Sequence, residues 1–324
     1  MIKLDDIREP VKLELKEFNK RFKSSISSNI PLLNLVTSYV LRRKGKQMRP
    51  LFVFLCSKMT GEITESTYNA AALIELMHTA TLVHDDVVDD SNERRGNFSV
   101  KAIWNSKVAV LLGDYLLAKG LLLAVEHKDY DLLEIASNAS REMSEGELLQ
   151  LQKSRNLNID LDTYYDVIRK KTAALIASCT ASGAKSSGAS QEIVDKAYNL
   201  GINIGMAFQI KDDLFDYQAP GLTGKPTGND IKEKKITLPL IFALNQAEPR
   251  HSKEIIRKIK RGNRSQEVVN EVVLFVKEKG GIEMASKKMH DFKQAALNEL
   301  DTFPDTPARN SLKNLVEFTV SRNK

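Results

Sequence analysis

The chain has 324 residues, 42% of them hydrophobic and 28% charged, a composition typical of a globular protein that buries a sizeable core. Its 48 Lys and Arg residues against 42 Asp and Glu residues give a formal net charge of +6. We interpret this small positive excess as evenly spread along the chain. It therefore favours anionic small molecules as ligands and argues against a nucleic-acid partner.

The N-terminal segment is predicted to be helical. Its apolar residues recur at helical spacing among mixed charges, unlike a signal or transit peptide: Ile7, Val11, Leu15, Phe18 and Phe22. Further along, Cys56 and Cys179 sit in apolar surroundings without metal-ligand spacing, which is typical of reduced thiols in a reducing compartment. We therefore expect a cytoplasmic protein.

Apolar residues three and four apart continue along the whole chain, and no long alternating strand pattern interrupts them. Segments rich in Gly, Pro and Ser, the clearest at 182–190 and 217–230, are too short for domain linkers. The most apolar run, Val108 to Val125, contains Asp114 and Lys119, so we expect it to fall short of a membrane span. The sequence thus predicts an all-α fold with a single domain over residues 1–324.

An acidic motif of the form D-D-x-x-D occurs twice. The first lies in "HTATLVHDDVVDDSNERRG" and the second in "FQIKDDLFDY", each after an apolar helical turn. Chance gives one such motif rarely and two far more rarely, so the repetition is a strong signal. The six aspartates are Asp85, Asp86 and Asp89 in the first motif and Asp212, Asp213 and Asp216 in the second.

Carboxylates four residues apart on a helix share one face and repel each other unless a cation lies between them. Mg²⁺ prefers oxygen ligands and is commonly held by one or two carboxylates together with substrate phosphates. The alternative is a solvated acidic helix face, which the doubling and the apolar flanks disfavour. Two such faces predict a site in which metal ions grip a polyphosphate.

Basic and polar residues near the aspartates supply groups that bind phosphate. Arginine binds phosphate bidentately and lysine acts as a point charge, so two basic groups suggest two phosphorylated substrates. His78 lies two helical turns before Asp85 and is equally compatible with a ligand or a core residue. The basic groups are Lys46 and Arg49 in "GKQMRP", Arg94 and Arg95 in "ERRG", and Lys171 with Thr172 in "RKKTAAL".

These motifs, with "VLLGDYLLAKG", "SEGELLQLQ" and "GKPTGNDIKEKKITLPL", resemble the trans-isoprenyl diphosphate synthases, or polyprenyl synthetases, in order and spacing from about Lys44 to Leu244. The resemblance implies a helical bundle of the isoprenoid synthase type with a central active-site cavity. It also implies a homodimer, and a prenyltransferase that joins isopentenyl diphosphate head-to-tail to an allylic primer, with farnesyl diphosphate as the expected primer. Only peripheral membrane contact, for product release, would be needed.

The same resemblance implies roles for individual residues. The first motif would bind two Mg²⁺ ions and the second a third, with Asp85, Asp89 and Asp212 as direct ligands and Asp86, Asp213 and Asp216 supporting them. Arg94, Lys171, Gln209, Lys225 and Lys235 match contacts to the allylic diphosphate, and Lys46, Arg49, His78 and Arg95 match the isopentenyl diphosphate pocket. Thr172 and Gln209 match polar groups near the reacting carbons, where positive charge develops.

Two positions bear on product length. Gln150 stands where short-chain relatives often have aspartate, and Ala80 stands where they carry a bulky aromatic residue that blocks the growing tail. We therefore expect the long-chain type, such as the octaprenyl diphosphate synthases, with a product of C30 or longer. The alternatives are a short-chain farnesyl or geranylgeranyl diphosphate synthase, another class I terpenoid synthase, and a non-enzymatic helical scaffold.

Overall fold

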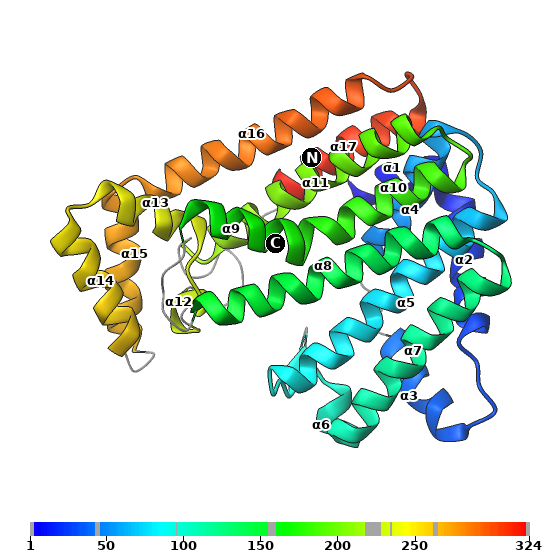
Figure 1. Cartoon of the computed structure of the whole chain (residues 1–324), viewed down its shortest axis with the longest axis horizontal. Coiled ribbons are helices and arrows are strands. Elements are labelled where there is room, and N and C mark those ends of the chain that lie inside the picture. The colour runs from blue at the N-terminus through cyan, green and yellow to red at the C-terminus, as the bar shows by residue number, and fades with distance from the viewer. Residues whose placement is uncertain are drawn as a thin grey trace. The chain divides into compact units, whose positions relative to one another are not determined.

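The computed structural model describes residues 3–42, 46–94, 96–154, 160–217, 228–233, 235–261 and 265–321, with only the backbone of Arg94, Ser154 and Asn229 (Figure 1). The predicted all-α fold class is confirmed, because the described elements are helices apart from one short antiparallel hairpin. In chain order the elements are α1 (Leu4–Arg8), η1 (Glu9–Val11), α2 (Lys12–Ser25), α3 (Pro31–Arg42), α4 (Met48–Thr60), α5 (Glu65–Val88), β1 (Glu93–Arg94), β2 (Asn97–Phe98), α6 (Val100–Trp104), α7 (Ser106–Glu126), α8 (Tyr130–Ser154), α9 (Leu161–Ile168), η2 (Arg169–Ala173), α10 (Ala174–Ser186), α11 (Gln191–Phe215), α12 (Asn229–Lys232), α13 (Leu238–Gln246), α14 (Pro249–Arg261), α15 (Gln266–Glu278), α16 (Gly281–Asp301) and α17 (Pro307–Ser321).

The chain divides into two compact units by its internal contacts. Unit 1 comprises Met1–Ser140, Ser178–Tyr198 and Phe303–Leu312, and unit 2 comprises Arg141–Ala177, Asn199–Thr302 and Lys313–Lys324. The single domain expected from the sequence stays a prediction. One local expectation is wrong: the loop predicted at 182–190 begins later, because α10 continues to Ser186.

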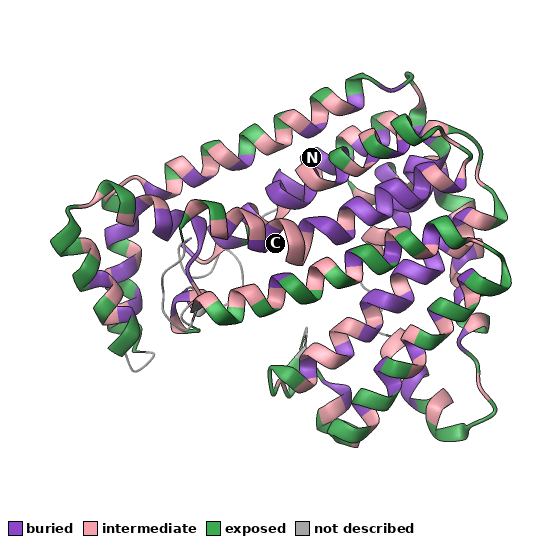
Figure 2. Cartoon of the chain, in the orientation of Figure 1, coloured by how far each residue is buried: buried purple, intermediate pink, exposed green. Residues whose placement is uncertain are grey.

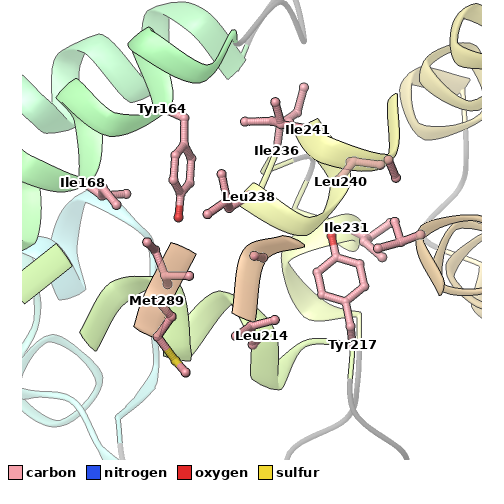
Figure 3. Packing of buried hydrophobic residues seen from close by; sticks show 14 of the residues in the cluster. Tyr164, Ile168, Leu214, Tyr217, Ile231, Ile236, Leu238, Leu240, Ile241 and Met289 are labelled. Atoms are coloured by element: carbon pink, nitrogen blue, oxygen red, sulfur yellow. The ribbon is translucent and has the colours of Figure 1, made fainter. Parts of the chain in front are cut away.

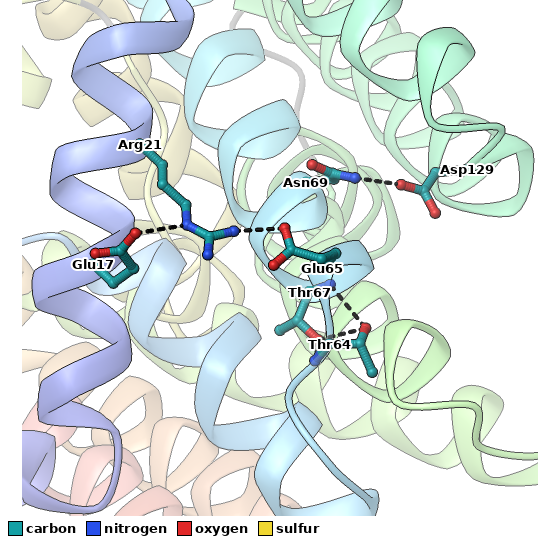
Figure 4. Close-up of polar contacts among 7 residues, drawn as sticks. All are labelled: Glu17, Arg21, Thr64, Glu65, Thr67, Asn69 and Asp129. Atoms are coloured by element: carbon teal, nitrogen blue, oxygen red, sulfur yellow. Dashed lines mark hydrogen bonds and ion pairs between the residues drawn. The ribbon is translucent and has the colours of Figure 1, made fainter.

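In unit 1, the N-terminal helices bury the apolar stripe predicted from the sequence: Ile7, Val11, Leu15, Phe18 and Phe22. The long helix α5 starts at a capping box, in which the Thr64 hydroxyl accepts from the Thr67 N–H and the Thr67 hydroxyl accepts from the Thr64 N–H. Nη1 of Arg21 on α2 donates a hydrogen bond to Oε2 of Glu65, at this end of α5, at 2.5 Å (Figure 4). The start of α5 is therefore fixed, and its far end carries the first acidic motif.

Helices α5 and α7 lie side by side in unit 1 (Figure 1). Their close approach depends on Gly113, because a Cβ at this position would lie 2.0 Å from Nε2 of His84. The His84 ring fills that space, with Nε2 3.2 Å from the carbonyl oxygen of Val110 and 3.5 Å from the Asp114 carboxylate. Gly113 of the "VLLGDYLLAKG" motif thus leaves space for the side chain of His84, the residue immediately before Asp85.

The prediction that the apolar run of α7 falls short of a membrane span is wrong: the helix is long enough and apolar enough to cross a membrane. About a third of its most apolar 18 residues are buried inside the protein. Core helices of soluble proteins pass the same test. The apolar side chains that α7 leaves exposed form one face: Val110, Leu111, Leu121, Leu122 and Val125.

Unit 2 is built around a large apolar cluster. Figure 3 shows Tyr164 of α9, Tyr217 beyond the end of α11, and Leu238 of α13 among its members. Between α9 and α10 the helix widens by one π-turn, η2, in which the Ala174 N–H donates to the carbonyl oxygen of Arg169, five residues back. Such turns often occur at functional sites because they alter which side chains share a helix face.

Candidate active site

The first acidic motif forms the C-terminal end of α5. Asp89 caps the helix, and its N–H donates to the carbonyl oxygen of Asp85 at 2.8 Å. Asp85 is half-buried, Asp86 is buried and Asp89 is exposed. Asp85 and Asp89 are therefore neighbours one helical turn apart, as predicted, and they lie at a helix end where Asp89 is exposed to solvent.

A short hairpin follows this motif. The Lys101 ammonium group pairs with the Asp90 carboxylate, and this contact lowers the pKa of Asp90. The Ser99 hydroxyl donates to the Ser91 carbonyl oxygen at 2.8 Å, which closes the loop that leads to β1 and β2. Arg94 lies in β1 without a described side chain, and Arg95 lies outside the described residues.

Three of the four residues predicted to bind isopentenyl diphosphate, Lys46, Arg49 and His78, lie just before α4, on α4 and on α5. Arg49, in the first turn of α4, places Nη1 4.0 Å from the carboxylate of Glu75 on α5, and His78 follows one helical turn later. Lys46 is exposed, and its carbonyl oxygen accepts from Arg8 at 2.5 Å. The structure thus brings Arg49 to the face of α5 that carries Glu75 and His78.

The second acidic motif ends α11, and its middle member, Asp213, is held by three hydrogen-bond donors. The Tyr164 hydroxyl donates to Oδ2 at 2.7 Å, Gln209 Nε2 donates to Oδ1 at 3.0 Å, and the Leu238 N–H donates to Oδ2 at 3.4 Å. Burial raises the pKa of Asp213 to about 7 despite these donors. Three elements, α9, α11 and α13, therefore fix this carboxyl group.

Thr172 and Gln209, both predicted to lie near the reacting carbons, meet directly. The Thr172 hydroxyl donates to Gln209 Oε1 at 2.8 Å, which extends the network to Asp213. The two helices approach closely because position 205 is glycine, where a Cβ would lie 2.4 Å from the Cα of Ala173. The π-turn and Gly205 together place a polar chain beside the second acidic motif.

Lys171, in the same π-turn, is held by α8. Its ammonium group lies 2.7 Å from the Glu147 carboxylate and donates to Gln150 Oε1 at 2.7 Å. Gln150 is the position singled out for product length, so the structure connects that position to a predicted diphosphate ligand. Both of these contacts lie within unit 2.

The sequence interpretation missed Asp230, which joins the second motif. Its N–H donates to Oδ2 of Asp216 at 3.1 Å, and burial followed by the nearby Asp216 charge raises its pKa to about 6. Lys235 reaches this group through its backbone N–H, which donates to the Asp230 carbonyl oxygen, and its ammonium group lies 2.6 Å from Glu233. The predicted ligand Lys225 lies outside the described residues.

Both acidic motifs occupy C-terminal ends of helices, where the helix macrodipole already carries negative charge. Carboxylates at such ends are destabilising unless a cation or proton offsets them. Within the described ranges, no group of three or more His, Cys, Asp or Glu side chains converges on one point. The donor set, carboxylates with Gln and Thr oxygens, matches Mg²⁺ shared with a substrate phosphate better than a closed protein cage.

Comparison with known proteins decides the family. The polyprenyl synthetase family model matches residues 30–276. An all-trans-nonaprenyl-diphosphate synthase (geranyl-diphosphate specific) of Rhodobacter capsulatus is 35% identical over 319 residues, which cover 98% of this chain and 97% of that protein. The chain belongs to the polyprenyl synthetase family.

Solved structures agree with this assignment. A polyprenyl synthase of Caulobacter crescentus, complexed with calcium and isoprenyl diphosphate, has a TM-score of 0.90 and 32% identity over 99% of this chain and 98% of that one. A geranylgeranyl pyrophosphate synthase of Bacteroides thetaiotaomicron has a TM-score of 0.83 and 38% identity over 98% of each chain. Both describe the fold of this polyprenyl synthetase across nearly its whole length.

Three predictions from the sequence are confirmed: the family, the isoprenoid synthase fold and the prenyltransferase class. Further curated relatives are octaprenyl and solanesyl diphosphate synthases, and they bear out the predicted trans-prenyl elongation to C30 or longer. The roles of individual residues stay predictions.

Proposed function

We propose that this polyprenyl synthetase clamps an allylic diphosphate through its two acidic motifs and extends it with isopentenyl diphosphate. The observation that carries this proposal is the fixed polar chain from Thr172 through Gln209 to Asp213, next to Asp212 and Asp216 at a helix end. Such preorganised oxygen donors suit a reaction in which positive charge develops on the primer.

The metal ions in this proposal are Mg²⁺, three per active site. Asp85, Asp89 and Asp212 would be direct ligands, while Asp86, Asp213 and Asp216 support them, and Asp230 joins the second group. When bound, the ions would supply Lewis acidity that makes diphosphate a leaving group. The destabilising position of these carboxylates at two helix C-termini supports a cationic occupant.

The chain's own residues would bind and orient the two substrates. Arg49, Lys46 and His78, with Arg95, would hold isopentenyl diphosphate alongside the primer, a positioning role that suits a carbon–carbon bond-forming step. Lys171 would bind the primer diphosphate; its contacts to Glu147 and Gln150 keep its ammonium group in one place. The proton lost at the end of each addition would go to the departing diphosphate.

For elongation to C30 or longer, we propose farnesyl diphosphate as the primer. Ala80 lies on α5, five residues before Asp85, and is fully buried, so the residues that the structure describes leave no open path beside it. The curated relatives support the long-chain product. The geranylgeranyl pyrophosphate synthase relative keeps a short product as the second candidate.

We further propose that the active form is a cytoplasmic homodimer joined through α7. The exposed apolar side chains of α7, from Val110 to Val125, support this, because they share one helix face, which also carries the exposed Lys107 and Asp114 at its centre. Both described cysteines are buried thiols, in keeping with a reducing compartment.

The test is incubation with farnesyl diphosphate, labelled isopentenyl diphosphate and Mg²⁺, followed by reverse-phase separation of the products. Label in a product of C30 or longer is the expected result. Label confined to geranylgeranyl diphosphate would select the short-chain candidate. Cyclisation without consumption of isopentenyl diphosphate, or no product at all, would contradict the proposal.

A further inference from the structure

Positive charge is locally concentrated in α14, contrary to the expectation of an even spread along the chain. Helix α14 carries six Lys or Arg residues and a single Glu, so it accounts for five of the six net positive charges of the whole protein. A second concentration, with five Lys or Arg residues and no acidic residue, occurs at 42–49, where Lys46 and Arg49 are predicted substrate ligands. No such role is predicted for the charge of α14, so α14 is a candidate for contact with an anionic partner.

The basic residues of α14 form one stripe. At 3.6 residues per turn, five of them fall within an arc of about 100° around the helix axis. All five are exposed: Arg250, Lys253, Arg257, Lys260 and Arg261. The sixth, Lys258, lies to one side of the stripe and is paired with Glu254 and Glu271, so the single acidic residue of α14 is engaged beside the stripe.

The opposite face of α14 is committed to the interior of unit 2. Ile255 and Ile259 are buried in the large apolar cluster, and the His251 ring packs edge-on against Phe275 of α15 at 5.0 Å between ring centroids. Figure 2 shows exposed positions along α14. The helix therefore offers charge to a partner and has no apolar face left to insert into it.

We propose that the basic stripe of α14 docks this enzyme on the surface of an anionic lipid bilayer. Basic residues near such a surface each add to the attraction, which operates over a Debye length. The choice of a bilayer rests on the proposed function, because a long-chain polyprenyl diphosphate combines an anionic head with a tail that water excludes. The stripe carries no aromatic side chain on which nucleic acid bases could stack.

The experiment is co-sedimentation of the full-length protein, without substrate, with vesicles of phosphatidylcholine alone or with about one third phosphatidylglycerol. We expect binding only to the anionic vesicles at about 0.1 M salt and loss of binding at about 1 M, because the contact is electrostatic. Binding to neutral vesicles, or binding that resists high salt, would contradict docking by charge and indicate insertion of an apolar surface.

A charge-reversal pair locates the contact. Arg257→Glu with Lys260→Glu should lower partitioning onto anionic vesicles by at least about tenfold. The matched control, Lys16→Glu with Lys20→Glu on exposed positions of α2, changes the net charge equally and should alter partitioning by less than about threefold. Equal losses in both variants would overturn the proposal, since net charge and not α14 would then determine binding.

A second measurement compares binding of duplex DNA with binding of anionic vesicles at the same salt concentration. If DNA binds the stripe where vesicles do not, the partner is nucleic acid and the proposal is overturned. Prenyl transfer in vesicle-free buffer should be the same in the α14 variant as in the unaltered protein. A chain that binds vesicles through α14 but fails to elongate farnesyl diphosphate would refute the proposed function and leave the docking surface standing.

Discussion

The aspartates that end α5 and those that end α11 share a burial pattern, because the second of each pair, Asp86 and Asp213, is only 5% exposed. Their surroundings differ. Asp213 accepts hydrogen bonds from α9, α11 and the start of α13. The first motif is followed by a mostly exposed hairpin, which the Ser99–Ser91 and Lys101–Asp90 contacts close. Each motif has one exposed aspartate, Asp89 or Asp212, and one that is half-buried, Asp85 or Asp216. Asp216 also accepts a hydrogen bond from the Asp230 N–H.

This difference teaches that one sequence pattern can be organised in two ways. In the second motif, protein donors fix Asp213 before any ligand arrives, at the cost of a buried carboxyl group whose pKa rises to about 7. The first motif is followed directly by a hairpin that is mostly exposed, and we expect a bound ligand to order this hairpin. We therefore expect the motifs to respond alike to loss of a metal ligand and differently to loss of a neighbour.

The largest effect should come from removing a direct ligand. Asp85→Ala and Asp212→Ala should each lower prenyl transfer by about a thousandfold or more, because the leaving group loses electrostatic stabilisation. Thermal stability without Mg²⁺ should be unchanged or slightly higher, since each change relieves like charge at a helix C-terminus. Asp6→Ala, at an exposed position of α1, is the control. If either variant kept activity near that of the control, the mutated motif would not bind the metal ions that hold the diphosphate.

The next effect is specific to the second motif. Tyr164→Phe removes a buried donor to Asp213 and should destabilise the protein by about 1–3 kcal/mol, because the carboxyl group loses a hydrogen bond that water cannot replace. Denaturant unfolding measures this, with Tyr165→Phe, its partly exposed neighbour, as the control. Rescue of the loss at low pH, where Asp213 is protonated, would further tie the effect to this carboxyl group. Equal stability of the two variants would show that Asp213 is not anchored by the Tyr164 hydroxyl.

The pH dependence of stability should reveal Asp230. Its folded pKa of about 6 lies above the ordinary value of 3.8, so the folded state binds the extra proton and metal-free protein loses stability as pH rises from about 4 to about 6. Asp230→Asn should remove that loss, a gain of at most about 2–3 kcal/mol above pH 6 in EDTA. Unfolding curves at several pH values test this, and parallel curves for both proteins would contradict it. With saturating Mg²⁺ the advantage of the variant should shrink.

The smallest effect on the first condensation is expected from a change behind the first motif. Ala80→Tyr places a ring on the buried face of α5, and overpacking of this kind costs about 1–3 kcal/mol. The diphosphate groups are untouched, so the first addition should persist while elongation stops after a few units. Product separation checks this, with Ala80→Ser as a small-residue control. A product of unchanged length would place the tail along another face of the helix.

Much of the site could be predicted because its spacing is local. Asp85 and Asp89, or Asp212 and Asp216, are four residues apart, and the apolar flanks identify their helices. The role of Tyr164 could not be predicted, because it meets Asp213 across 49 residues of sequence. The π-turn that places Thr172 leaves no mark in the apolar spacing, which runs on from α9 into α10. The charge of α14 was countable from the sequence, but only the burial of Ile255 and Ile259 shows which face remains for a partner.

Hydrogen exchange at the two motifs, with and without Mg²⁺ and inorganic pyrophosphate, tests the central claim most directly. Without ligand, amides at 212–217 should exchange slowly and those at 89–99 rapidly. Addition of both ligands should slow exchange at 89–99 by at least about tenfold and change 212–217 much less, because the exposed hairpin after the first motif is the part that a ligand can still order. No change at 89–99, or an equal gain at both motifs, would contradict the account of one preorganised and one ligand-organised half of the clamp.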